Sequence, residues 1–319
     1  MDSTNPFYKQ VRLLVQLLPI VGQQSCFALK GGTAINLFVR NLPRLSVDID
    51  LAYIPMTDRA HALSEIDQAL KTIAKEIERR FSGLDVLAQP NPLTGTLLKL
   101  NIADTDAIVK IEVTPVLRGA VYEAEIDHFS PRVEEHFGYA EIPLLSFNDL
   151  YAGKICATLD RQHPRDLYDT LLLLNNEGLS DKLVVAFMVY LISHNRPMAE
   201  LLAPRQKPIA EIYEAEFKGM TFDEVDLSIL EVTLPRLVKE LHSRLTPEDK
   251  AFLLSFKQGQ PNWDHLGIQH IEQLPSVRWK LLNLDRMDKA KRHEAIGNLE
   301  AVLHKGSGLQ KSACGTTPQ

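Results

Sequence analysis

Residues 45–54, LSVDIDLAYI, carry the pattern that most limits how this chain can fold. Apolar and polar residues alternate along the stretch, as in a β-strand with one buried face. Because residues i and i+2 of a strand point the same way, Asp48 and Asp50 lie on one face, and Ile49 and Leu51 lie on the other. We therefore expect a strand that buries its apolar face and leaves two carboxylates together.

Two carboxylates on one strand face repel each other unless a cation lies near both. The Cα atoms of residues i and i+2 are about 6 to 7 Å apart in a strand. Oxygen ligands at this separation suit Mg²⁺ with bound phosphate. The ordinary alternative is a solvated strand face, because an isolated D-x-D also occurs by chance. Asp48 and Asp50 are thus a candidate metal site. The neighbouring motifs decide between a metal site and a solvated strand face.

A glycine pair precedes this strand. Residues 26–30, CFALK, are expected to form a short strand that ends at Gly31 and Gly32. Residues 33–40, TAINLFVR, have helical spacing, with Thr33 placed as the N-cap. The free N–H groups at a helix N-terminus favour an anion such as a triphosphate. A glycine pair by itself is usually only a turn.

A third acid comes from a later strand. Residues 96–103 and 107–116 are expected to form a hairpin, and residues 57–81 form the clearest amphipathic helix of the chain. In the second hairpin strand Lys110 and Glu112 share a face. If that strand pairs beside the aspartate strand, Glu112 joins the metal ligands. The alternative is a solvated Lys and Glu on an edge strand.

Beyond residue 142 the pattern becomes helical. Residues 276–305 are expected to form one long helix. Trp263 and Trp279 are expected to lie in core or interlobe packing, with base-stacking platforms as the alternative. The fold class predicted is α/β (α+β), with a mixed, mostly antiparallel sheet and a C-terminal helical domain. The predicted domains are a catalytic domain at 1–141, a helical domain at 142–305 and a disordered tail at 306–319.

Composition narrows the functional classes. The chain has 319 residues, three cysteines and a net charge of −6, which argue against a disulfide framework, a zinc site and wholesale coating of nucleic acid. No stretch resembles a membrane span or a signal peptide, so a cytoplasmic protein without a membrane partner is expected. Residues 278–311 carry 8 basic and 4 acidic side chains. This segment is a candidate RNA-binding surface, with a solvated helix face as the alternative.

Several motifs occur together in a recognisable order. KGGTAINLFVRNLPRLSVDIDL at residues 30–51 contains a glycine turn followed by Arg44, Ser46, Asp48 and Asp50. KIEV at 110–113, DLYAGKICATLDRQHPRDLYD at 149–169 and PSVRWKLLNL at 275–284 follow it. This arrangement resembles the AbiEii/AbiGii-type nucleotidyltransferase toxins of the polymerase-beta-like superfamily.

The resemblance implies a role for each matching residue. It implies that Asp48 and Asp50 bind Mg²⁺ with Glu112 assisting, and that Lys154 and Asp166 complete the catalytic set. The residues implied to bind the nucleoside triphosphate are Gly31, Gly32, Thr33, Arg44, Ser46, Lys154, Arg165 and Asp169. From the residues alone, a salt bridge between Lys154 and Asp166 that ties two helices together is an equal alternative.

The resemblance also implies an activity and partners. Such toxins transfer a nucleoside monophosphate to the 3′ end of tRNA, block translation, act in phage defence and are encoded beside an antitoxin. One rival is transfer to a hydroxyl of a protein or a small molecule, which the net charge of −5 over residues 1–150 favours. Another is a catalytically dead binding module, against which the complete set of Asp48, Asp50 and Lys154 argues.

Overall fold

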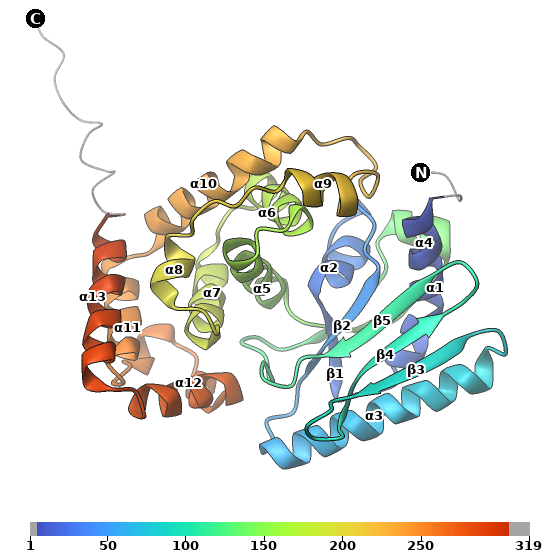
Figure 1. Cartoon of the computed structure of the whole chain (residues 1–319), viewed down its shortest axis with the longest axis horizontal. Helices are drawn as coiled ribbons and strands as arrows, with labels where there is room; N and C mark the ends of the chain where they lie inside the picture. Colours follow the sequence, from blue (N-terminus) through green and yellow to red (C-terminus); the bar gives the residue numbers. More distant parts are fainter. Residues whose placement is uncertain (1–4, 306–319) are drawn as a thin grey trace, which may run out of the picture. The chain divides into compact units, whose positions relative to one another are not determined.

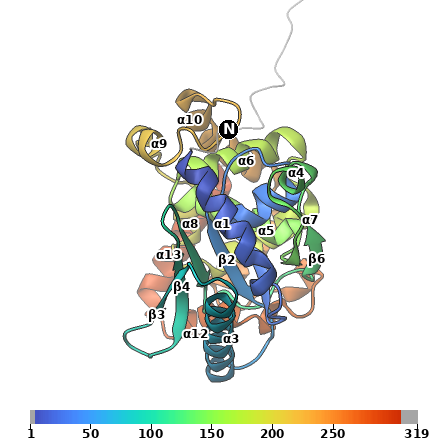
Figure 2. The ribbon, with the colours of Figure 1, turned by 90° about the vertical axis from the view of Figure 1, so that its right-hand side faces the viewer.

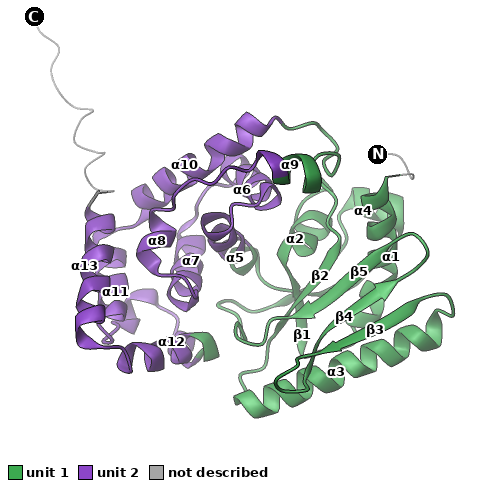
Figure 3. Cartoon of the chain, viewed as in Figure 1, with its two compact units in different colours: residues 1–150, 212–225, 274–276 green, residues 151–211, 226–273, 277–319 purple. Residues whose placement is uncertain are grey.

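A computed structural model describes residues 5–305, and the chain forms two compact units (Figure 3). The first unit comprises residues 1–150, 212–225 and 274–276, and the second comprises residues 151–211, 226–273 and 277–319. Compact units do not test where an independently folding domain begins, so the domain boundary expected at residue 141 stays a prediction. The expected disordered tail at 306–319 lies outside the described residues.

The first unit is built on a seven-stranded mixed sheet with the order β3-β4-β5-β2-β1-β7-β6. Strands β1–β7 and β2–β5 pair in parallel, and the other four neighbouring pairs are antiparallel. The predicted fold class is therefore confirmed. The strands are β1 Phe27–Lys30, β2 Asp48–Tyr53, β3 Asp85–Pro90, β4 Leu97–Ala103, β5 Ile108–Val113, β6 Glu125–His128 and β7 Glu141–Leu144.

Two helices of this unit, α1 Pro6–Val21 and α3 Arg59–Arg80, lie side by side against the sheet (Figure 2). Helix α3 begins after Asp58, whose carboxylate accepts hydrogen bonds from the first free N–H groups of the helix. Its apolar residues recur at helical spacing and are buried, as expected for this amphipathic segment. A short helix, α4 Pro131–Phe137, precedes β7.

The helix after β1 differs from its prediction. It begins at Gly31, directly after the strand, and α2 Gly31–Ala34 continues into a π-helix at Ile35–Val39. Thr33 as N-cap is therefore wrong, because the cap position belongs to Lys30 and Thr33 lies inside the helix. The positive φ of 74° at Gly31 lets the chain change from strand to helix without an intervening turn.

A segment far along the chain belongs to the first unit. Residues 212–225 return to it, and the amide of Leu45 donates to the carbonyl of Met220 at 2.8 Å. The amide of Phe222 donates to the carbonyl of Pro43 at 3.2 Å, and the Arg132 guanidinium lies 3.8 Å from the centre of the Phe222 ring. The segment thus covers the loop that precedes β2.

The second unit is helical (Figure 1). Its helices are α5 Phe147–Asp160, α6 Pro164–Asn176, α7 Asp181–Ser193, α8 Met198–Leu202, α10 Leu227–Arg244, α11 Pro247–Lys257, α12 Pro275–Asp285 and α13 Lys289–Lys305, of which α5 and α12 begin in the first unit. Helix α9 Ala210–Glu216 begins in the second unit and ends in the first. None of the helices between residues 5 and 305 combines the length and apolar character that crossing a bilayer requires.

Two expectations for the C-terminal part are corrected. The single helix expected over 276–305 is wrong, because α12 ends at Asp285 and the Asp288 side chain accepts hydrogen bonds from the first amides of α13. Trp279 is 51% exposed and is not a core residue. Trp263 does pack against aromatic rings, with its ring centre 5.9 Å from that of Phe252.

Candidate functional residues in two clusters of charged side chains

The sheet register brings the predicted carboxylates together in the first unit. Strand β5 pairs in parallel with β2, so Glu112 is the register partner of Asp50. Asp48 and Asp50 are half-buried, whereas Ile49 between them is fully buried. The aspartate face is thus the polar face of β2, and the expected pairing of the two acidic strands is confirmed.

Two lysines accompany these acids. Lys30, the last residue of β1, is the register partner of Asp50 and donates to Thr114 Oγ1 at 3.0 Å. Burial lowers the pKa of Lys30, and the charges of Asp50 and Glu112 partly offset that effect. The ammonium of Lys110 lies 3.0 Å from Glu112 Oε2. The cluster is therefore a mixed one, in which cationic side chains partly compensate the three acids.

The neighbouring acids keep the Lys110 ammonium protonated. Burial alone would lower its pKa, but the hydrogen bond to Glu112 and the charges of Asp48, Glu112 and Asp50 raise it. Lys110 therefore stays protonated and neutralises part of the negative charge that would otherwise destabilise three neighbouring carboxylates.

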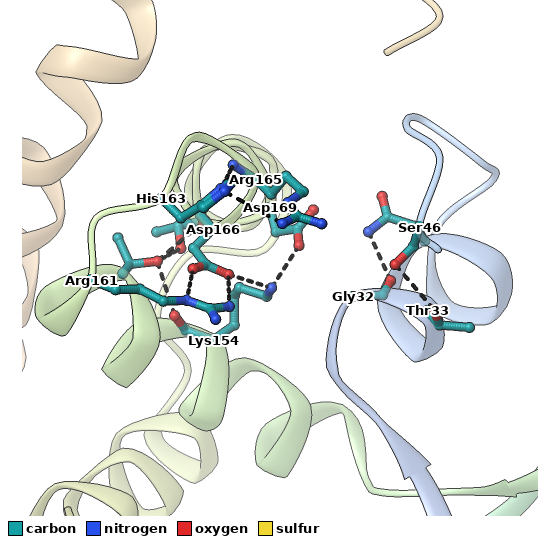
Figure 4. Close-up of polar contacts among 12 residues, drawn as sticks. Gly32, Thr33, Ser46, Lys154, Arg161, His163, Arg165, Asp166 and Asp169 are labelled. Atoms are coloured by element: carbon teal, nitrogen blue, oxygen red, sulfur yellow. Dashed lines mark hydrogen bonds and ion pairs between the residues drawn. The ribbon is translucent and has the colours of Figure 1, made fainter. Parts of the chain in front are cut away.

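The glycine pair lies against this acidic face. A Cβ atom on Gly31 would be 2.7 Å from Asp50 Oδ2, and a Cβ atom on Gly32 would be 2.7 Å from Arg44 Nη2 and 2.8 Å from Ser46 Oγ. Figure 4 shows Gly32, Thr33 and Ser46 together at the start of the helix. A side chain at either glycine would therefore displace the Asp50 carboxylate or the ends of Arg44 and Ser46 from these positions.

Hydrogen bonds hold the same elements together. Thr33 Oγ1 donates to the main-chain carbonyl of Asp48 and lies 3.0 Å from Ser46 Oγ. The Arg44 guanidinium is buried and donates to the carbonyl of Leu45 at 2.8 Å. Of the predicted nucleotide-binding residues, Gly31, Gly32, Thr33, Arg44 and Ser46 are therefore neighbours around the start of α2 and of β2.

The donor set fits Mg²⁺ only in part. Within residues 5–305, no three carboxylate, imidazole or thiol groups form a ready-made metal cage. Mg²⁺ does not require one, because it is commonly held by one or two carboxylates together with phosphate oxygens and water. Asp48 and Asp50 are carboxylates of this kind, and their binding of Mg²⁺ stays a prediction. Glu112 faces Lys110 instead, so its role as a third ligand stays a prediction.

A second cluster lies in the second unit, where α5 and α6 pack together. The Lys154 ammonium is 2.8 Å from Asp166 Oδ1 and 2.9 Å from Asp169 Oδ2 (Figure 4). All three side chains are buried. Arg161 also pairs with Asp166, with its Nη2 atom 3.0 Å from Oδ1. The predicted shared face of Asp166 and Asp169 is confirmed, as is the salt bridge between the two helices.

Charge controls the ionisation of this cluster. Burial alone would raise the pKa of Asp166, but the charges and hydrogen bonds of Lys154 and Arg161 hold it well below its usual range. Asp166 is therefore ionised at neutral pH. A buried pair of this kind is costly to break, because removal of one partner leaves an uncompensated charge.

Arg165 lies at the start of α6 beside His163. The backbone amide of Arg165 donates to His163 Nδ1 at 3.1 Å, which makes His163 the N-cap of the helix. The first acidic residue of the helix, Asp166, follows in the first turn, where the helix dipole favours negative charge. The predicted members Lys154, Arg165, Asp166 and Asp169 thus belong to one pair of helices.

Some residues of both clusters were not predicted. Lys30 and Arg161 were missed, although Lys30 directly precedes the glycine pair and Arg161 lies five residues before Asp166. Thr158 was also missed, and its hydroxyl lies 2.8 Å from Thr170 Oγ1 between α5 and α6. The strand alternation of β1 was the available signal for Lys30, but no local pattern identifies the two others.

Comparisons with known proteins agree with this architecture. A family model described as nucleotidyl transferase AbiEii toxin, type IV toxin–antitoxin system, matches residues 12–282. A solved structure of MenT4, a nucleotidyltransferase toxin from Mycobacterium tuberculosis, is similar with a TM-score of 0.56 and 15% identity, over 93% of each chain. A comparison with curated proteins found no match. Because the family model covers most of the sequence, the chain belongs to the AbiEii nucleotidyltransferase toxin family.

Proposed function

We propose that this chain transfers a nucleoside monophosphate from a nucleoside triphosphate to the 3′ end of tRNA, with Mg²⁺ as the cofactor. The single observation that carries the proposal is the arrangement of Asp48, Asp50 and Glu112 on paired strands beside the glycine start of α2. Membership of a nucleotidyltransferase toxin family supports the reaction class.

Each residue has a defined task in the proposed reaction. Asp48 and Asp50 hold Mg²⁺, which supplies charge neutralisation at the phosphates when bound. Gly31, Gly32, Thr33, Arg44 and Ser46 orient the triphosphate at the start of α2, where free N–H groups favour an anion. We retain Lys154, Arg165, Asp166 and Asp169 as proposed contributors to nucleotide binding, with the two aspartates holding the Lys154 ammonium in place.

The bond changes balance without a further reactant. A hydroxyl oxygen of the acceptor forms a bond to the α-phosphorus, and the bond from that phosphorus to the bridging oxygen breaks. Pyrophosphate leaves with the electron pair of the broken bond. The hydroxyl proton passes to the Glu112 carboxylate, which lies beside Asp50 in the sheet register.

Membership of the toxin family supports the proposed acceptor and partners. A toxin that modifies the tRNA 3′ end stops translation, and a cognate antitoxin would restrain it. Both tRNA and nucleoside triphosphates occur in the cytoplasm, where we propose that the protein acts, with a role in phage defence. The net charge of −5 over residues 1–150 favours a protein or small-molecule hydroxyl as the second candidate acceptor.

The test is a labelling experiment with the full chain. The protein is incubated with each α-³²P-labelled nucleoside triphosphate, MgCl₂ and total RNA, and the RNA and protein fractions are separated. We expect label in the tRNA band. The variants Asp48→Asn and Asp50→Asn keep the side-chain shape but lose the charge that binds the metal, so we expect transfer to fall by at least ~10²-fold in each.

A matched control is Glu78→Gln, which removes an exposed acid on α3 and should leave transfer and the melting temperature unchanged. Label on protein rather than on RNA would show that the acceptor is a protein, and the enzyme would still be a nucleotidyltransferase. Full transfer by a well-folded Asp50→Asn variant would refute the proposed site. Addition of EDTA tests the metal directly, and transfer that persists in EDTA would refute the cofactor.

A further inference from the structure

A pocket of about 550 Å³ lies within the second unit. Its lining residues lie between 259 and 292, far along the chain from Lys154 and its partners. They come from the segment 259–272 that follows α11 and from α12 and α13, the helices labelled in Figure 1. Its walls include the indole of Trp263 and the apolar side chains of Leu281 and Leu282. Arg278 and Arg292 supply positive charge to the same walls. The pocket therefore combines an aromatic surface with two guanidinium groups.

Neither arginine of the pocket is held in a close ion pair with a carboxylate of residues 5–305. In the described part of the chain Arg292 Nε is a buried atom without a hydrogen-bond acceptor. The guanidinium of Arg292 lies against the backbone of Gly259, where an added Cβ atom would be 3.5 Å from Nη1. A buried donor without a partner costs free energy, and no acceptor among residues 5–305 offsets that cost at Arg292 Nε.

Two further cations increase the local charge. Burial lowers the pKa of Lys257, and the positive charge of Arg292 lowers it further. Burial likewise lowers the pKa of Lys280, with Lys257 as the second cause. Lys257 and Lys280 do not line the pocket, but these effects show that like charges on α11, α12 and α13 repel one another beside it. An anion bound there would relieve the repulsion.

The pocket also contains Glu272 and Asp285, which form no ion pair within residues 5–305. A simple inorganic anion would gain nothing from these carboxylates. A nucleotide unit matches all of the groups, because its phosphate accepts from guanidinium groups, its base stacks on an indole, and its exocyclic amino groups donate to carboxylates. The wall residues thus favour a nucleotide over a bare phosphate.

We propose that this pocket binds one unpaired nucleotide of an RNA, with its phosphate at Arg278 and Arg292 and its base against Trp263. The inference rests on the proposed function for the identity of the RNA, since an acceptor RNA needs a binding surface beyond the reacting hydroxyl. It also separates the basic residues of the C-terminal segment: Arg278 and Arg292 line the pocket, whereas Lys289 and Lys291 are exposed outside its walls.

The test is RNA binding by the full chain, measured by fluorescence anisotropy with a fluorescein-labelled single-stranded RNA of about ten nucleotides at several salt concentrations. We expect Arg292→Gln to weaken binding about tenfold and to reduce the slope of log affinity against log salt by about 0.7, the value for one lost phosphate contact. Arg278 is exposed, so Arg278→Gln provides a second variant that keeps the fold and should weaken binding in the same direction.

Two control variants distinguish a contact in the pocket from a general effect of positive surface charge on RNA binding. Lys289→Gln removes a cation from the same helix as Arg292, and Lys239→Gln removes an exposed cation from α10. We expect each to change affinity less than about twofold, as for a long-range charge effect in salt. An equal loss in Lys289→Gln and Arg292→Gln would overturn the pocket in favour of a diffuse basic face.

Other outcomes separate this inference from the proposed function. Unchanged RNA affinity in both arginine variants overturns the pocket alone. If the wild type binds free AMP through Arg292 but binds no RNA, the proposal that the nucleotide belongs to an RNA is refuted. The proposal that RNA is the acceptor is refuted with it. RNA binding that depends on Arg292, together with no transfer of label to RNA, supports the pocket and refutes the proposed acceptor.

Discussion

At the scale of single residues, we expect removal of the Lys154 ammonium to lower the free energy of unfolding strongly. It is buried and pairs with both Asp166 and Asp169. The variant Lys154→Met leaves two buried carboxylates with less positive charge, so we expect the free energy of unfolding to fall by about 3 to 5 kcal/mol. Urea unfolding followed by circular dichroism measures this change.

An exposed lysine provides the control for Lys154. Lys239→Met, on α10, should change the free energy of unfolding by less than about 0.5 kcal/mol. Calorimetric titration with a nucleoside triphosphate should accompany both variants. A Lys154→Met protein that is as stable as the wild type but binds the nucleotide weakly would contradict the structural role and favour direct contact with phosphate.

The same cluster predicts a pH dependence. Burial alone would raise the pKa of Asp166, but Lys154 and Arg161 hold it below the value of about 3.9 found in unfolded chains. The unfolded state therefore takes up the proton first, and the stabilisation from Asp166, present above about pH 4, is lost as the pH falls toward the folded-state pKa.

Urea unfolding at pH 7, 5, 4 and 3 tests this dependence. The Asp166→Asn variant should be less stable than the wild type at pH 7 and should lose less stability between pH 5 and pH 3. The variant Asp85→Asn, at an exposed strand position, should follow the wild-type curve. Parallel curves for wild type and Asp166→Asn would show that Asp166 does not supply the dependence.

At the scale of elements, the start of α2 depends on glycine for two separate reasons. Gly31 has a φ of 74°, and a Cβ atom there would lie 2.7 Å from Asp50 Oδ2. The variant Gly31→Ala should cost about 1 to 2 kcal/mol for the left-handed backbone and should displace the Asp50 carboxylate. We expect transfer activity to fall more steeply than the melting temperature.

The matched control for Gly31 is Gly83→Ala. A Cβ atom on Gly83 meets nothing within 4 Å, and its φ is not in the left-handed region. This variant should keep both stability and activity. If Gly31→Ala retained full activity in the labelling experiment, the close approach of the helix start to Asp50 would have no functional consequence.

At the scale of the whole molecule, segments far apart in the sequence support one another. The amide of Leu45 donates to the carbonyl of Met220, and Phe217 in the same segment is fully buried. The variant Phe217→Ala should lower the free energy of unfolding by about 3 to 5 kcal/mol. Because it loosens the segment, it should also speed hydrogen exchange at the Leu45 amide, as measured by mass spectrometry.

Ile212→Ala is the control for that experiment, because Ile212 belongs to the same segment but is 38% exposed. It should leave exchange at Leu45 close to the wild-type rate. Equal protection of Leu45 in Phe217→Ala and wild type would show that the loop before β2 does not depend on residues 212–225.

Elements whose sequence has strong periodicity were predicted and are confirmed. Elements whose sequence lacks it were not predicted. The alternation around Asp48 and Asp50 and the helical spacing of α3 are local patterns that burial of one face imposes. Strands β3 and β6 lie at the sheet edges and expose most of their side chains, so they show no alternation of buried and exposed residues. The break before α13 depends on a capping contact of Asp288.

The sequence by itself determined which residues could carry charge on one face, because strand and helix periods alone place Asp48 with Asp50 and Asp166 with Asp169. It also determined the family, because the linked motifs depend on residue identity and order. Only the tertiary structure decided that Glu112 is the register partner of Asp50, that Lys154 is buried between two aspartates, and that Arg278 and Arg292 line one pocket. The physical reason is that strand register, helix packing and the return of residues 212–225 are set by contacts between distant segments, which no local period contains.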